Sequence, residues 1–240
     1  SIQLSSYLAT VNITLRLDVD CVNISRYARD WMPTAPSRTR RKPRDRYHHG
    51  DLRRALLDEA LRTIQHDGVG ALTLRTIGLA LGVSRTALYR HFTDKRALLS
   101  VVATEGFRML KERLLEAWSP GGVRGFNAMG VAYIRFAMAN PSHYRVMFGG
   151  FVDNAARDAE LTREATAAFQ ALVDSLVALQ KDGSVRKDDP LQLAQFIWAT
   201  VHGISMLIID GQLHLQQPQI DDLIQFAIER IHTGVARRAR

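Results

Sequence analysis

The sequence has a single cysteine, Cys21, among 240 residues. A lone cysteine cannot close an intramolecular disulfide, which excludes a disulfide-rich secreted scaffold and fits a reducing compartment. Long apolar runs are also missing, because the longest, near 196–209, is interrupted by small and polar residues and looks too short to span a bilayer. The chain does not open on a basic segment followed by an apolar one, as a signal peptide would. These absences predict a soluble, cytoplasmic protein without a membrane partner.

Motifs of enzymes, metal sites and cofactor sites are missing as well. His48, His49, His66 and His91 do not have the spacing of a zinc-binding motif, and Cys21 stands alone. No glycine-rich loop follows a strand, as dinucleotide binding would need. We therefore predict no enzymatic activity, no cofactor and no metal.

Basic charge is present, and it is confined to one part of the chain. Residues 1–99 contain 17 Lys and Arg against 9 Asp and Glu, whereas residues 100–240 contain 15 of each. The whole net charge of +8 therefore belongs to the N-terminal part. This distribution indicates one domain that binds a polyanion, joined to a second domain that does not. A merely soluble basic surface is the alternative.

The first 49 residues show no helical pattern. A weak alternation over 11–17 could pass for a lone strand, but a single strand would have no partner. Residues 33–50 are rich in proline and charge, which indicates a flexible basic arm. We expect the natural start at Met32 and an upstream extension over 1–31. A genuine disordered or strand-like tail is the rival interpretation.

Helical periodicity begins at Asp51 and continues to the end of the chain. Caps and spacing predict about nine helices, so the expected fold class is all-α. The first four expected helices are one at about 51–67, one at 74–81 that Thr73 caps, a short one that Ser84 caps, and one that Asp94 caps and that runs to about 118. Five more are expected at about 123–139, 141–148, 161–179, 190–209 and 219–236.

Two short helices joined by residues 81–84 form a helix-turn-helix pattern. Gly82 suits a left-handed residue at the turn, and Val83 is expected to fill the hinge. In this geometry the first turn of the second helix faces base edges in the major groove, where Arg85 could bond a guanine and Thr86 could touch a base. Phosphate contacts are expected from Ser84, Tyr89, Arg90, His91 and Lys95. A solvated helix face is the alternative.

Residues 72–99 resemble the DNA-binding domain of the TetR/AcrR family of transcriptional regulators. The resemblance lies in Leu72-Thr73-Leu74-Arg75, Gly82-Val83-Ser84, Leu88-Tyr89-Arg90-His91-Phe92, Lys95 and Leu98. It implies a base contact by Arg75. The full expected DNA-binding set is Thr73, Arg75, Ser84, Arg85, Thr86, Ala87, Tyr89, Arg90, His91 and Lys95. Gly78 departs from the family, which more often has alanine there; it should loosen the helix by up to ~1 kcal/mol but could let the two helices approach closely.

The second half of the chain resembles, more weakly, the TetR branch whose C-terminal domain is named for a Trp…His-Gly motif. The resemblance lies in residues 140–148 and 198–203. It implies a domain for effector binding and dimerisation.

Aromatic residues of this half could line an apolar site for a small effector. Trp198 and His202 share a helix face, and Gly203 beside them lets another helix or a ligand come close. The candidate effector-binding set is Phe126, Tyr133, Phe136, Tyr144, Met147, Phe148, Phe169, Trp198 and His202. The alternatives are that these residues form only core, and that the His202 ring simply bonds a neighbour such as Tyr144.

The segment 190–209 is apolar nearly all round, so one side should meet the core and another side a twin helix. With 219–236 alongside, this predicts a four-helix interface in a homodimer. The alternative is a central core helix of a monomer.

These patterns predict a flexible extension and basic arm over 1–49, a helix-turn-helix domain over 50–98, and a ligand-binding and dimerisation domain over 99–240. The expected function is a ligand-responsive repressor, which a small apolar or amphipathic effector releases from a double-stranded DNA operator. The alternatives are a helical DNA-architectural protein without ligand control and an interaction protein that has lost DNA binding. The large neutral half argues against the first, and the intact DNA-binding set against the second.

Overall fold

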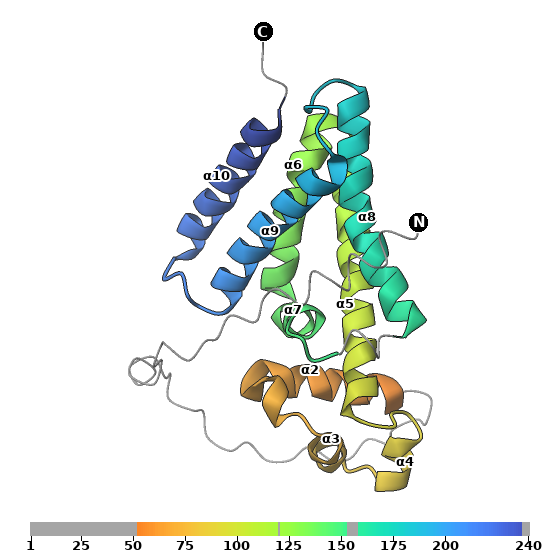
Figure 1. Ribbon diagram of the computed structural model, residues 1–240. Coiled ribbons are helices and arrows are strands. Elements are labelled where there is room, and N and C mark those ends of the chain that lie inside the picture. The colour runs from red at the N-terminus through yellow and green to blue at the C-terminus, as the bar shows by residue number, and fades with distance from the viewer. Residues whose placement is uncertain (1–51, 120, 153–157, 237–240) are drawn as a thin grey trace. The chain divides into compact units, whose positions relative to one another are not determined.

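The computed structural model describes residues 52–119, 121–152 and 158–236, and every regular element in these ranges is a helix (Figure 1). The helices are α2 (Leu52–Ala71), α3 (Leu74–Leu81), α4 (Arg85–Tyr89), α5 (Lys95–Trp118), α6 (Gly122–Ala139), α7 (Pro141–Phe148), α8 (Ala159–Lys181), α9 (Pro190–Ile209) and α10 (Gln217–Val235). The prediction of an all-α fold with about nine helices is confirmed. The weak alternation at 11–17, the predicted extension and arm over 1–49 and the expected start at Met32 lie outside the described residues.

Helix starts follow the caps that the sequence predicted. The side-chain oxygens of Thr73, Ser84 and Asp94 each accept a hydrogen bond from the backbone N–H three residues on, at 3.0, 3.2 and 2.8 Å. Each bond satisfies an N–H group that has no partner inside the helix. These three caps place α3, α4 and α5 one after another with only short turns between them.

α2 does not end where the sequence predicted. The helix was expected to stop at Asp67 and Gly68, but helical backbone resumes and continues to Ala71. Gly68 interrupts it with φ 78° and ψ 167°, a kink in a region that favours glycine. The glycine therefore ends the straight part of α2, and a further short turn follows it.

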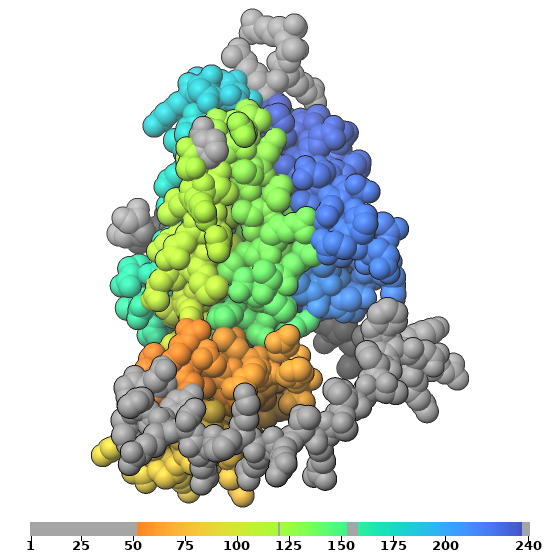
Figure 2. All heavy atoms as spheres, turned by 180° about the vertical axis from the view of Figure 1, so that it is seen from behind, coloured from red at the N-terminus to blue at the C-terminus, as the bar shows by residue number. Residues whose placement is uncertain are grey.

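Leu56–Arg240 forms one compact unit in which α5 is the central helix. α5 contacts α6, α7 and α8, while α9 contacts α6 and α8, and α10 contacts α6 and α9. Seen from behind, the atoms of α6 lie between those of α5 and those of the C-terminal helices (Figure 2). Val102, Ile134, Leu176 and Ile224 are fully buried at these contacts. Burial of each such side chain contributes about 1.5–3 kcal/mol.

α9 is longer than the apolar run predicted from the sequence. It begins at Pro190, and its 20 residues are long and apolar enough to cross a membrane by length and composition alone, so the expectation that this segment is too short was wrong. Core helices of soluble proteins pass the same test. Only 28% of the apolar stretch of α9 is buried by the described part of the chain. Phe196 and Leu207 on its outer face are 56% and 44% exposed.

Candidate nucleic-acid interface and effector site

The turn between α3 and α4 depends on two glycines. Gly82 ends α3 at φ 66° and ψ 29°, a left-handed conformation that residues with a Cβ rarely adopt. Val83 then donates its N–H to the Gly78 carbonyl at 3.0 Å. A Cβ on Gly78 would lie 2.9 Å from Leu88 Cδ1. The close approach that the sequence suggested for Gly78 is therefore present, and α4 lies directly against α3.

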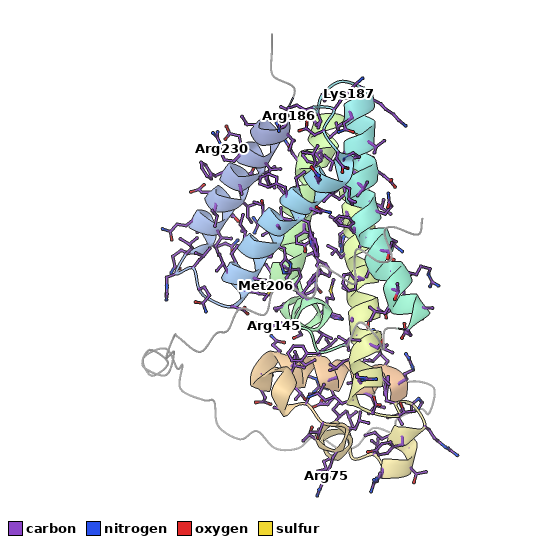
Figure 3. The ribbon with its side chains drawn as sticks, in the orientation of Figure 1. Arg75, Arg145, Arg186, Lys187, Met206 and Arg230 are labelled. Carbon is purple, nitrogen blue, oxygen red and sulfur yellow. The ribbon has the colours of Figure 1, made fainter. Side chains whose placement is uncertain are left out.

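α4 turns its polar face outward because Leu88, on the opposite face, is buried. Arg75 on α3 also points away from the helices (Figure 3). Thr73, Arg75, Ser84, Arg85, Thr86, Tyr89 and Arg90 of the predicted DNA-binding set are exposed, and Ala87, His91 and Lys95 are half-buried. The structure thus brings the whole set together on α3, α4, the adjoining turns and the first residue of α5. The set holds arginines, a lysine and hydroxyl groups and no carboxylate, which suits a polyanion.

Arg85 and Tyr89 contact each other on α4. The guanidinium carbon of Arg85 lies 5.4 Å from the centroid of the Tyr89 ring, within cation–π range. Such a contact at an exposed site is worth about 0.5–1 kcal/mol. It holds the guanidinium beside the first turn of α4, where the sequence predicts a base contact.

Lys95 has a partner that the sequence did not reveal. Its Nζ donates to the Val69 carbonyl at 2.7 Å, joining the start of α5 to the residue after the Gly68 kink. An ammonium has three N–H donors, so this bond leaves two for another acceptor. Lys95 is therefore positioned to serve both as a tie within the helix-turn-helix region and as a phosphate ligand.

Rings from four helices meet in one cluster. The cluster consists of Tyr133 on α6, Tyr144 and Phe148 on α7, Phe169 on α8, and Trp198 and His202 on α9. The ring centroids of Phe148 and Trp198 lie 4.7 Å and 5.8 Å from that of His202. Most of the pairs are tilted or edge-to-face, geometries that the aromatic quadrupole favours. We name these six residues the aromatic cluster.

Four polar atoms lie together inside the aromatic cluster. The Tyr144 hydroxyl lies 2.7 Å from His202 Nδ1 and 3.0 Å from the Tyr133 hydroxyl. Trp198 Nε1 donates to the Tyr133 hydroxyl at 3.0 Å, and Tyr133 lies 3.3 Å from His202 Nδ1. The hydrogen bond between His202 and Tyr144, considered from the sequence as an alternative to ligand contact, is therefore present.

The aromatic cluster carries no charge at neutral pH. Burial lowers the pKa of His202 to about 4, because an imidazolium would lose its hydration there. Burial also raises the pKa of the Tyr133 and Tyr144 hydroxyls. The cluster therefore offers neutral donors and acceptors surrounded by aromatic rings.

The other predicted effector residues lie in the core but outside this cluster. Phe126, Phe136 and Met147 are buried, and within the described ranges neither phenylalanine ring contacts a ring of the aromatic cluster. Sequence reasoning missed Phe107 on α5, whose ring packs edge-on against Phe148 at 5.3 Å. Its role could not be read from spacing, because the faces of α5 contact three different helices.

The described residues contain no group of three or more His, Cys, Asp or Glu side chains that could hold a metal ion. His48, His49 and Cys21 lie outside those residues.

Two family models match the chain. The model described as bacterial regulatory proteins, tetR family, matches residues 56–102, which contain the helix-turn-helix. The model described as tetracyclin repressor-like, C-terminal domain, matches residues 126–231, which contain α7–α9 and most of α6 and α10. The matches therefore cover both the candidate nucleic-acid interface and the aromatic cluster.

Curated relatives match the N-terminal part only. The tetracycline repressor proteins of class D from Escherichia coli and class H from Photobacterium damsela subsp. piscicida are each 38% identical to the chain over 53 residues. This stretch is 22% of the chain and 24% of each relative. The chain thus matches about a quarter of the length of these relatives.

Solved structures match most of the chain. A protein of unknown function from Rhodococcus sp. RHA1 is 31% identical, with a TM-score of 0.70 over 80% of this chain and 98% of its own. A TetR family transcription regulator from Marinobacter aquaeolei VT8 is 20% identical, with a TM-score of 0.62 over 79% of this chain and 97% of its own. The second similarity is one of fold.

Proposed function

The chain belongs to the tetR family of bacterial regulatory proteins, and from this premise we propose that it is a DNA-binding transcriptional regulator, a repressor that a small molecule releases from its operator. The exposed basic and hydroxyl set on α3 and α4 carries the proposal. In this proposal residues 50–98 form the DNA-binding domain and residues 99–240 the ligand-binding and dimerisation domain. The basic arm over 33–50 adds phosphate contacts.

The proposed DNA contacts follow from the helix-turn-helix. Arg85 and Thr86 open α4 and would read base edges in the major groove, while Arg75 at the start of α3 would add a base contact. Ser84, Tyr89, Arg90, His91 and Lys95 would meet phosphates. The support is that all of them lie on α3, α4, the adjoining turns or the first residue of α5, and that none is fully buried.

Dimerisation is proposed through the outer face of α9 together with α10. Phe196, Ala199, Gly203 and Leu207 recur at three- and four-residue spacing, so they form one stripe along α9. A Cβ on Gly203 would meet nothing within 4 Å, so this part of the stripe is open to a second helix. Phe226 on α10 is 59% exposed and adds to the apolar surface. A second copy of the chain would cover this surface.

The aromatic cluster is the proposed effector site, and α7 is the element through which binding would affect the DNA-binding domain. Tyr144 and Phe148 belong to the cluster, while Ser142 on the same helix donates to the Leu61 carbonyl of α2 at 3.2 Å. A ligand that moves α7 would therefore also move α2. The two recognition helices of the dimer would then be spaced wrongly for successive major grooves.

Footprinting of the purified protein on the DNA beside its own gene tests the proposal. We expect the protein to protect one short palindromic site, and this protection should persist when nonspecific competitor DNA is added at physiological salt. A DNA-architectural protein, the second candidate, would instead coat the fragment without a preferred site. Uniform binding that weakens steeply with salt and shows no protected palindrome would favour this second candidate.

A further inference from the structure

The hydrogen-bond pattern of the aromatic cluster determines which ring nitrogen of His202 carries the proton. Tyr133 and Tyr144 have one hydroxyl proton each, and the Trp198 indole is a donor only. If Nδ1 accepts, Trp198 and Tyr144 donate to the Tyr133 hydroxyl and Tyr133 donates to His202 Nδ1, so every proton has an acceptor. With Nδ1 protonated, one phenolic proton would have no acceptor among these four groups. His202 is therefore the neutral tautomer with its proton on Nε2.

The Nε2 atom of His202 has no hydrogen-bond partner among the described residues. Both hydrogen bonds of His202 to described residues are made through Nδ1. Nε2 is not one of the fully buried polar atoms that lack a partner, so it remains open to water or to a ligand. The His202 ring, with Phe148 and Trp198 beside it, is itself only half-buried.

We propose, on the basis of the proposed effector site, that the effector is an uncharged apolar molecule bearing a hydrogen-bond acceptor, such as a ketone, ester or amide carbonyl, which receives the Nε2–H of His202. Its apolar part lies against the rings of Phe148, Trp198 and Phe169.

A charged effector does not fit the same residues. The six residues of the aromatic cluster include no arginine, lysine or carboxylate. The nearby Arg145 on α7 is engaged, because it donates to the Ile209 carbonyl at 2.6 Å and pairs with Asp210 at the end of α9 (Figure 3). A carboxylate or ammonium would lose its hydration there without gaining a countercharge.

Nitrogen NMR of the full-length protein tests the tautomer without any ligand. Long-range correlation of the imidazole protons with the two ring nitrogens identifies the protonated nitrogen. The His202 signals are assigned by their loss in His202→Gln. We expect Nε2 to be protonated and Nδ1 to be unprotonated at pH 7. A proton on Nδ1 would overturn the proposal, because Nε2 would then be an acceptor.

A matched series of ligands tests the effector class by calorimetry. The series is methyl naphthyl ketone, its hydrocarbon isostere isopropenylnaphthalene, and naphthoate. We expect the ketone to bind about tenfold more tightly than the hydrocarbon, since one neutral hydrogen bond to the site is gained. Naphthoate should bind most weakly. His202→Phe should remove the advantage of the ketone, while His214→Phe, at an exposed histidine, should keep it.

The outcomes separate this inference from the proposed function. Equal binding of ketone and hydrocarbon, both weakened by Trp198→Leu, would overturn the inference and keep the effector site. Binding that Trp198→Leu leaves unchanged, or no binding of any probe, would overturn the effector site and the inference together. A tenfold preference for naphthoate would also overturn the inference.

Discussion

At the residue scale, Arg85 and Lys95 have different proposed roles on DNA, so their alanine variants should change DNA binding in different ways. Arg85→Ala should cost ~1–3 kcal/mol of operator affinity and relax the preference at one base pair, because a bidentate base contact is lost. Lys95→Ala should weaken binding to all sequences alike and reduce the salt dependence. Competition binding with single-base operator variants at several salt concentrations measures both effects.

The Lys95→Ala experiment needs a control, because Lys95 also bonds the Val69 carbonyl within the protein. Its bond to the Val69 carbonyl predicts that Lys95→Ala also lowers the melting temperature, whereas Arg90→Ala, an exposed variant, should weaken DNA binding without that loss. An equal loss of affinity for Arg85→Ala and Lys95→Ala, with unchanged base preference in both, would contradict the assignment of roles.

His202 predicts a pH dependence of folding stability. Its pKa is lowered from the ordinary 6.5 to about 4 by burial, so the unfolded chain binds a proton over a pH range in which the folded chain does not. Stability from the neutral ring is fully present above pH 6.5, falls as pH drops, and is lost at about pH 4, a change of at most ~3 kcal/mol.

Urea unfolding at pH 7.5 and pH 5 measures this effect. The stability gap between wild type and His202→Gln should narrow by ~2 kcal/mol at the lower pH, because the glutamine does not titrate. His214→Gln, at an exposed histidine, should follow the wild-type pH profile. Parallel profiles for wild type and His202→Gln would show that His202 titrates normally.

At the element scale, polar pairs join α5 to α8. Lys111 Nζ donates to Glu164 Oε2 at 2.6 Å, and this hydrogen bond is the main reason that the pKa of Glu164 lies below its usual value. Glu164 is buried, so Lys111→Met should cost ~1–2 kcal/mol of stability, since the carboxylate loses its closest partner.

A second pair on α5 provides the comparison for Lys111→Met. Arg113 and Glu116 form an exposed pair three residues apart on the same helix, and such pairs contribute little. Arg113→Met should therefore change the free energy of unfolding by less than ~0.5 kcal/mol. Urea titrations of both variants measure the difference, and equal losses would mean that the Lys111 pair is no stronger than a surface pair.

α7 connects the aromatic cluster with α2, so Ser142→Ala should loosen α2 without disturbing the cluster. The variant removes the hydrogen bond to the Leu61 carbonyl, and hydrogen exchange of α2 amides should become faster by several-fold. Ser175→Ala removes a comparable bond from α8 to its own Leu172 carbonyl and serves as the control. Mass spectrometry that finds unchanged exchange in α2 would contradict the connecting role of α7.

At the scale of the whole molecule, the open stripe on α9 predicts a dimer at micromolar concentration. Light scattering should give about twice the chain mass of 26.9 kDa. Phe196→Glu combined with Leu207→Glu should give the monomer mass, because two carboxylates would be buried against the twin helix. Leu115→Glu, at an exposed apolar position of α5, should remain a dimer. A monomeric wild-type protein would favour the alternative of a core helix.

The sequence by itself determined where the capped helices begin and where α3 ends. Thr73, Ser84 and Asp94 start helices and Gly82 ends one because caps satisfy backbone groups within three or four residues. The same local pattern indicated the helix-turn-helix and its outward polar face. The kink at Gly68 was less visible, since a glycine that stops a helix and one that bends it look alike in sequence.

Only the tertiary structure decided which side chains meet. Tyr133 and His202 are 69 residues apart, and Lys95 and Val69 are 26 apart, so no helical period relates them. The sequence could list aromatic residues on the apolar faces of several helices, but it could not separate Tyr133 from Phe126, because both are equally suited to a core. Partners across helices depend on crossing angles and on which face each helix turns inward, and these arise from packing of the whole unit.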